Sequence, residues 1–187
     1  WHMENMTYAN ISAVDVSKVT DMTKMFGSNF ALETVELGEF NTASLMYAED
    51  MFSDCGELRA LDLSNMKMGK VKSMRRMVAY CGSLQTLNVS GWDTSNVTDM
   101  SEAFAGCRLL EELDVSSFDT ARVENFFGAF SGLEFVTALD VGHFDTSAAT
   151  NMDSMFDGNF SLTTLDVSGF NTAHVQNLNR MFTNCQN

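Results

Sequence analysis

The sequence predicts an α/β fold built as a solenoid of about seven 26-residue rungs, each with a short strand and a short helix. The first observation is that phenylalanine recurs at a fixed step of 26 residues, with Val78 filling the one gap. The second is a segment in each period whose apolar residues alternate at step two, as in a strand with one buried face. The third is a segment whose apolar residues recur at steps of three and four, as on a helical face. The recurring phenylalanines are Phe26, Phe52, Phe104, Phe130, Phe156 and Phe182.

The strand of each rung is predicted from the motif L-x-x-L-x-L/V, which is LQTLNV at residues 84–89. Successive side chains of a strand point to opposite faces. We therefore expect Leu84, Leu87 and Val89 to face the core, and the polar residues between them to face outward.

The helix is predicted from the motif V-x-x-M-x-x-M/A-F, which is VTDMSEAF at residues 97–104. Ser95 or Asn96 would cap its start, and Gly106 stands where a left-handed residue often ends a helix. A single rung cannot bury its own apolar face, so rungs must stack on one another. Stacking would align the recurring Phe and Leu residues into one continuous core.

A resemblance to a known family rests on the repeated motifs. The L-x-x-L-x-L pattern is the leucine-rich-repeat signature, and LQTLNVSGWDTSNVTDMSEAFAGC at residues 84–107 resembles the BspA-like leucine-rich repeat of bacterial surface proteins of unknown function. The likeness runs from about residue 9 to residue 185 and is weakest at residues 66–80. It implies a right-handed leucine-rich-repeat solenoid, secreted or at the cell surface, that serves adhesion. It implies no catalytic residue.

The domain organisation follows from the same repeat. Residues 1–187 are expected to form a single leucine-rich-repeat domain. The sequence starts and stops within a rung and has no obvious polar caps, so we expect a piece of a longer surface protein. Extracellular or cell-surface localisation is expected, with the signal and anchor outside the sequence. No signal peptide is visible, and no apolar run approaches the ~20 residues of a membrane helix.

Charge and motifs restrict the function classes. The net charge of −14 disfavours nucleic acid and anionic membranes as partners. The three histidines are scattered, and no nucleophile, zinc-protease or phosphate-loop motif is present. We therefore expect no enzyme, no catalytic residue and no cofactor.

The outward strand residues form the predicted binding face, where an acidic column recurs from rung to rung. Such a column could bind a cation or a basic partner, or it could simply be a solvated face. Because no calcium-loop motif occurs, we expect no metal. We expect recognition of a host or matrix protein or glycan across this face, with the oligomeric state left open. The alternative is a structural stalk that presents another domain. The predicted binding residues are Glu33, Glu36, Arg59, Asp62, Gln85, Asn88, Glu111, Asp114, Asp140 and Asp166.

Two aromatic residues interrupt polar columns and are second candidates for contact. Phe127 stands among Thr, Glu, Arg, Ser, Asp and Asn, and Phe135 shares a column with Leu109 and smaller or polar residues. An exposed apolar cluster would mark a binding surface. A local shift of the predicted helix that buries Phe127 is the alternative.

Other columns favour structural roles. Cys55, Cys81 and Cys107 share one column, interpreted as buried thiols rather than a metal or disulfide ladder. A second acidic column, which includes Asp93, is expected to bond the turn backbone. The threonine after each of these residues, such as Thr94, is expected to cap the helix. Six of the 11 Lys and Arg residues lie between residues 59 and 76. They form either a solvated basic surface or a contact for an acidic partner.

Overall fold

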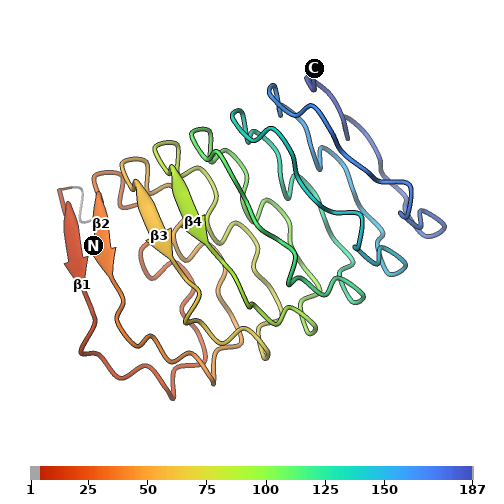
Figure 1. Cartoon of the computed structure of the whole chain (residues 1–187). Coiled ribbons are helices and arrows are strands. Elements are labelled where there is room, and N and C mark those ends of the chain that lie inside the picture. The colour runs from red at the N-terminus through yellow and green to blue at the C-terminus, as the bar shows by residue number, and fades with distance from the viewer. Residues whose placement is uncertain (1–4, 187) are drawn as a thin grey trace.

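The chain winds into a stack of coils, where a coil is one 26-residue period of the backbone. In this computed structural model, residues 5–186 are described. The first and last described coils lie at opposite ends of the stack (Figure 1). Four three-residue strands lie side by side on the first coils: β1 (Tyr8–Asn10), β2 (Thr34–Glu36), β3 (Ala60–Asp62) and β4 (Thr86–Asn88). β1 pairs with β2 and β3 with β4, both in parallel, which gives two two-stranded sheets.

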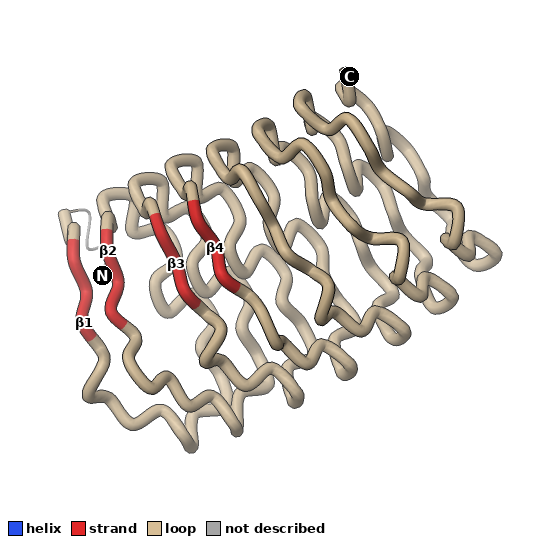
Figure 2. The backbone as a smooth tube through the Cα atoms, viewed as in Figure 1, coloured by secondary structure: helices blue, strands red, loops and turns tan. Residues whose placement is uncertain are grey.

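The predicted α/β class is wrong. Residues 5–186 contain no helix, and outside the four strands the chain consists of turns and loops (Figure 2). The right-handed leucine-rich-repeat solenoid of strand-plus-helix rungs is therefore not the architecture of this chain. The 26-residue step itself appears as parallel backbone pairing, because isolated bridges join equivalent positions from Asp21 and Tyr47 through to Asn151 and Asn177.

Consecutive tight turns replace the predicted helix. An α-helix needs each N–H to reach the carbonyl four residues earlier. Here the N–H groups of Met100, Glu102, Phe104 and Gly106 instead donate to carbonyls of the next coil, at 2.7 to 3.1 Å. The amides between them turn back three residues, as from Ala103 to Met100 at 3.0 Å. Glu102 and Gly106 have φ of 52° and 69°, left-handed values that a helix interior excludes.

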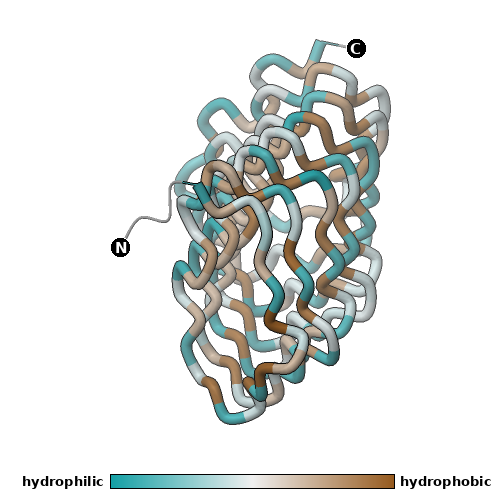
Figure 3. Tube along the Cα trace, turned by 90° about the vertical axis from the view of Figure 1, so that its left-hand side faces the viewer, coloured by the Kyte–Doolittle hydropathy of each residue, from teal (hydrophilic) through white to brown (hydrophobic). Residues whose placement is uncertain are grey.

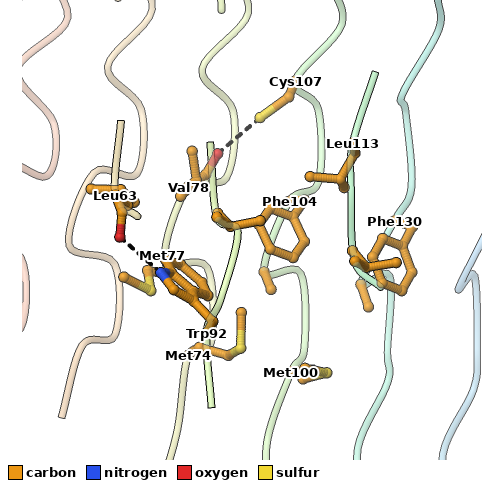
Figure 4. Packing of buried hydrophobic residues seen from close by; sticks show 14 of the residues in the cluster. Leu63, Met74, Met77, Val78, Trp92, Met100, Phe104, Cys107, Leu113 and Phe130 are labelled. Atoms are coloured by element: carbon orange, nitrogen blue, oxygen red, sulfur yellow. Dashed lines mark hydrogen bonds between the residues drawn. The ribbon is translucent and has the colours of Figure 1, made fainter. Parts of the chain in front are cut away.

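The core is continuous along the stack, because apolar residues at equivalent positions of successive coils pack on one another. Phe104 stacks on Phe130 with ring centroids 5.8 Å apart, and Phe130 stacks on Phe156 at 6.0 Å. Trp92 is 1% exposed, and its indole Nε1 donates to the Leu63 carbonyl at 2.9 Å (Figure 4). Hydrophobic and hydrophilic residues alternate along each coil (Figure 3). The shared core predicted from the 26-residue step is confirmed.

Asx turns fix the corners of each coil. Asn88, Asp93 and Asp99 each accept, through Oδ1, the N–H of the residue two positions later, at 2.8 to 3.1 Å. Equivalent bonds recur in the other coils, for example from Ser147 to Asp145 at 2.9 Å. The structural role predicted for the second acidic column is thus confirmed, although the turn it holds leads to no helix.

The threonine column joins neighbouring coils. Thr94 is fully buried; its hydroxyl donates to the Asp119 carbonyl and accepts the Asp119 N–H, both at 2.8 Å. Thr146 makes the same pair of bonds with Asn171, at 3.1 and 2.7 Å. The predicted helix-capping role is wrong because there is no helix to cap. The hydroxyls satisfy the backbone of the next coil.

Candidate recognition face

The exposed sides of the strands form the candidate recognition face. In β2, β3 and β4 the first and third residues are exposed and the middle residue is partly or fully buried. This alternation is the one expected of a strand with one face on the core. All the strand-face residues selected from the sequence are exposed: Glu33, Glu36, Arg59, Asp62, Gln85, Asn88, Glu111, Asp114, Asp140 and Asp166.

Two hollows lie on this face. One of about 470 Å³ spans β2, β3 and β4, and residues such as Asp62 and Asn88 line it. The other, of about 330 Å³, lies next to β4 and is lined by Gln85, Glu111 and Glu112, among others. The structure thus brings four of the selected residues to the walls of two neighbouring hollows. Asp140 and Asp166 lie further along the stack, where the bridge between Ala138 and Thr164 continues the pairing.

The sequence analysis missed the column two positions before Asn88. Thr34 and Thr86 line the larger hollow, and Thr86 and Glu112 line the smaller one. The step-two alternation that marks Asn88 as outward also marks residue 86 as outward, so the signal was present in the sequence.

The acidic residues of the face also have a structural role that was not anticipated. Asp62 Oδ1 accepts the Ser64 N–H at 3.0 Å, and Asp114 Oδ1 accepts the Ser116 N–H at 2.9 Å. Hydrogen bonds from Ser116 hold the pKa of Asp114 below its usual range, and the pKa of Asp166 is lowered in the same way by Ser168. Asp114 and Asp166 are therefore ionised at neutral pH and contribute negative charge to the face, while one oxygen of each holds a turn.

Phe127 and Phe135 both lie on the surface, in different places. Phe127 is 37% exposed, so the alternative in which it is buried is wrong. Phe135 is 54% exposed and Leu109, in the same column one coil earlier, is 38% exposed. Arg108 and Glu134 precede these two residues, and their side chains are 3.6 Å apart. Leu109 and Phe135 are therefore exposed apolar residues at equivalent positions of neighbouring coils.

Two of the six Lys and Arg residues between residues 59 and 76 form ion pairs. The Asp50 carboxylate is 6% exposed and lies 3.3 Å from Arg75 Nη2 and 3.1 Å from Arg76 Nε. Arg76 Nη2 also lies 3.3 Å from Asp54 Oδ2. These two arginines compensate a buried carboxylate, which is costly to leave unpaired. Arg59, Lys67, Lys70 and Lys72 remain exposed.

Tyr80 extends this cluster into the next coil. The Arg76 guanidinium lies 5.2 Å from the centroid of the Tyr80 ring, a cation–π contact. The Tyr80 hydroxyl donates to the Glu102 carboxylate. Burial and this hydrogen bond raise the pKa of Tyr80 to about 12. The cluster ties together three coils at the rung that departs most from the repeat.

All four cysteines are free thiols, and three of them are buried in the core. Cys55, Cys81 and Cys107 are fully buried, and the Cys107 thiol donates to the Val78 carbonyl of the preceding coil at 3.0 Å (Figure 4). A hydrogen bond with the Cys81 thiol, together with burial, raises the pKa of Cys55. The interpretation as buried structural thiols is confirmed. Within residues 5–186 no group of three His, Cys, Asp or Glu side chains is placed to hold a metal ion.

The stacking and the face define the class: a repeat protein whose 26-residue units pair in parallel and expose one polar face. The family model described as "Mycoplasma protein of unknown function, DUF285" matches residues 2–88 and again residues 74–187, and the chain belongs to this family. No curated protein and no solved structure matches the chain. Among residues 5–186 there is no helix of the length and apolar character needed to cross a membrane.

Proposed function

We propose that the chain is a non-enzymatic recognition module that binds a host or matrix protein or glycan through the candidate recognition face. The observation that carries this proposal is the pair of neighbouring hollows on one exposed face, lined by Asp62, Gln85, Asn88 and Glu111. Repeat arrays offer extended surfaces of this kind for binding. The likeness of the repeated motif to BspA-like repeats supports adhesion at the cell surface as the setting.

The charge of the face favours a basic protein as the partner. Glu33, Glu36, Glu111, Glu112 and the ionised Asp114 all lie exposed on it, and the whole chain carries a net charge of −14. Complementary charge speeds encounter and rejects like-charged partners. An acidic glycan would meet repulsion here, so a protein with exposed lysine or arginine fits the face best.

A structural stalk is the second candidate, and one observation favours it. The aspartates of the face hold Asx turns, as Asp62 does with Ser64, so their recurrence needs no ligand to account for it. The glutamates are the residues that separate the two proposals. No hydrogen bond or ion pair involves the Glu111 or Glu112 carboxylate in the described part of the chain, so neither has a visible structural task.

The test is therefore the double variant Glu111→Lys/Glu112→Lys. Surface plasmon resonance with immobilised extracellular-matrix proteins and with a lysine-rich peptide measures binding. We expect the parent to bind the peptide and at least one basic matrix protein, and the variant to bind about tenfold more weakly or worse, a loss of about 1.4 kcal/mol per tenfold.

Two control variants sharpen the result. Glu124→Lys reverses an exposed charge outside the face and should leave binding unchanged. Asp114→Asn removes a charge from the face but keeps the Oδ1 acceptor, so a moderate loss of binding with only a small loss of stability is expected. If the parent binds none of the probes, or if Glu111→Lys/Glu112→Lys binds as the parent does, recognition through this face is wrong and the stalk is favoured.

A further inference from the structure

Leu109 and Phe135 form an apolar corner where two successive coils turn toward the candidate recognition face. Their side chains are 38% and 54% exposed. The residues just before them, Arg108 and Glu134, approach to 3.6 Å, so the two coils are in register at this corner. Described coils lie on both sides of these two, and the exposure therefore belongs to the interior of the stack.

The core does not account for the apolar corner. Each of its residues is followed by a buried one, Leu110 or Val136, which makes the core contact at this point of the coil. The column of the corner holds Ser83 and Ser161 in the coils before and after, so a small polar side chain fits the fold at this position. Exposed apolar surface that folding does not require is typical of a contact site.

Two carboxylates without partners lie beside the apolar corner. Glu111 and Glu112 follow Leu109 by two and three positions, line the smaller hollow of the face, and make no ion pair or hydrogen bond within residues 5–186. Glu134 differs, because Arg108 already pairs with it. A cation that reaches this corner therefore meets Glu111 and Glu112 as the free carboxylates.

The face is not closed by strand pairing at this coil. β3 and β4 pair before it, and after it the Thr163 N–H donates to the Thr137 carbonyl at 2.9 Å. Residues 111–114, between these two paired regions, make no backbone hydrogen bond within the described chain, and no strand follows β4 (Figure 2). Backbone N–H and C=O groups need partners, so those of residues 111–114 are left to water or to a bound segment.

We propose that the partner engages this site with an extended segment in which a large apolar residue is followed two positions later by lysine or arginine. The apolar side chain covers Leu109 and Phe135, and the cation binds Glu111 and Glu112. Alternate side chains of an extended segment share one face about 7 Å apart, and Leu109 and Glu111 are separated by the same step of two along the coil. The inference rests on the recognition function proposed above and specifies the motif of the partner.

A second copy of this chain suits the site less well. A two-fold contact through Leu109 and Phe135 would bring Glu111 and Glu112 of both copies together. Like charges across a contact disfavour it, and the net charge of −14 adds to the repulsion. A basic partner removes both costs, because its cation neutralises the two carboxylates while its apolar side chain covers the corner.

Three peptides of equal length and charge test the motif by isothermal titration calorimetry. The motif peptide carries phenylalanine and lysine two positions apart. The serine peptide has serine in place of the phenylalanine, and the shifted peptide has phenylalanine next to lysine. The parent should bind the motif peptide about tenfold more tightly than either of the others, because only this peptide buries its ring on the corner while its lysine reaches the glutamates.

The variant Leu109→Ser/Phe135→Ser places at the corner the residue that the column already holds at Ser83, so it should fold as the parent does. Circular dichroism and thermal melting check this. The variant should bind all three peptides equally, with the affinity of the parent for the serine peptide. Phe127→Ser is the matched control, since Phe127 is 37% exposed in a column that holds Ser101. It should keep the preference of the parent.

A parent that does not distinguish the three peptides overturns the motif. So does a preference that survives in Leu109→Ser/Phe135→Ser or is lost in Phe127→Ser. Sedimentation velocity tests the second copy, because a parent dimer that Leu109→Ser/Phe135→Ser dissociates would assign the corner to self-association instead. The recognition function can stand while the motif fails: Glu111→Lys/Glu112→Lys would then still weaken binding of the serine peptide.

Discussion

At the scale of single residues, buried hydroxyls and exposed carboxylates hold the backbone through hydrogen bonds. The Thr94 hydroxyl satisfies both the N–H and the carbonyl of Asp119 on the next coil. Met68 occupies the equivalent position in the rung that departs most from the repeat. The threonine column is therefore a clamp between coils, and its loss leaves backbone groups buried without partners.

Replacing Thr94 by valine tests this clamp. Valine keeps the shape of the side chain but offers no donor or acceptor, so the Asp119 N–H and carbonyl lose their partner. Thr94→Val should lower the free energy of unfolding by about 1–3 kcal/mol, measured by urea denaturation. Thr172 stands in the same column but is exposed. Thr172→Val should change stability by less than about 0.5 kcal/mol, and an equal loss in both variants would contradict the clamp.

The Asx turns make stability depend on acid pH. Hydrogen bonds from Ser95 and Ser147 lower the pKa of Asp93 and Asp145. A lowered folded-state pKa adds stability above the unfolded pKa of about 3.9, and that stability is lost as pH falls through the folded value. The urea midpoint should therefore drop as pH falls below about 4.

The variant Asp93→Asn/Asp145→Asn isolates this effect. Asparagine makes the same turn at Asn41 and Asn171, where Oδ1 accepts a backbone N–H at 3.2 and 3.0 Å. The variant keeps the turns but lacks the ionised carboxylates, so its urea midpoint should lie somewhat below that of the parent at neutral pH and change less on acidification, and the two midpoints should converge at low pH. Parallel pH profiles for parent and variant would show that these carboxylates contribute nothing to the acid sensitivity.

At the scale of elements, the strands of the first coils could be predicted from sequence, whereas the predicted helix was wrong. Step-two alternation places Leu87 and Val89 toward the core, as the structure has them. The apolar spacing of VTDMSEAF suits a helical face, but a series of turns that points every third or fourth residue inward has the same spacing. Periodicity indicates which residues are buried, but it does not indicate which carbonyl accepts each N–H.

One sequence signal argued against the helix. Gly128 stands inside the predicted helical segment of its rung, at the position where Glu102 has φ of 52°. The glycines at 106, 132 and 158 fit a helix end equally well, so they did not discriminate. The exposure of the residues on the candidate recognition face was predictable from alternation. The turn-forming role of Asp62 and Asp114 was not, because whether Oδ1 can accept the N–H two residues later depends on the local backbone conformation.

The left-handed turn position gives a prediction at this scale. Gly158 has φ of 77°, and an added Cβ would lie 3.6 Å from the nearest atom, Gly132 Cα, so space is not the obstacle. Gly158→Ala should cost about 1–2 kcal/mol through backbone strain alone. Gly82 has ordinary φ and open space around its Cα. Gly82→Ala should stay within about 0.5 kcal/mol of the parent, as thermal denaturation can show.

At the scale of the whole molecule, stability comes from junctions between neighbouring coils, so it should fall from the middle of the stack to its ends. An interior coil has a junction on both sides, and the last coil has one. Phe104 and Phe182 occupy the same column, but the Phe104 N–H donates to Ala129 at 3.1 Å, while the Phe182 N–H has no acceptor within residues 5–186.

Hydrogen exchange read amide by amide measures this gradient. In dilute solution the Phe104 amide should exchange only through opening of an interior junction and be strongly protected, whereas the Phe182 amide should exchange close to the rate of an unstructured peptide. Equal protection of Phe104 and Phe182 in dilute solution would mean that the coils do not act as separate units with nearest-neighbour coupling.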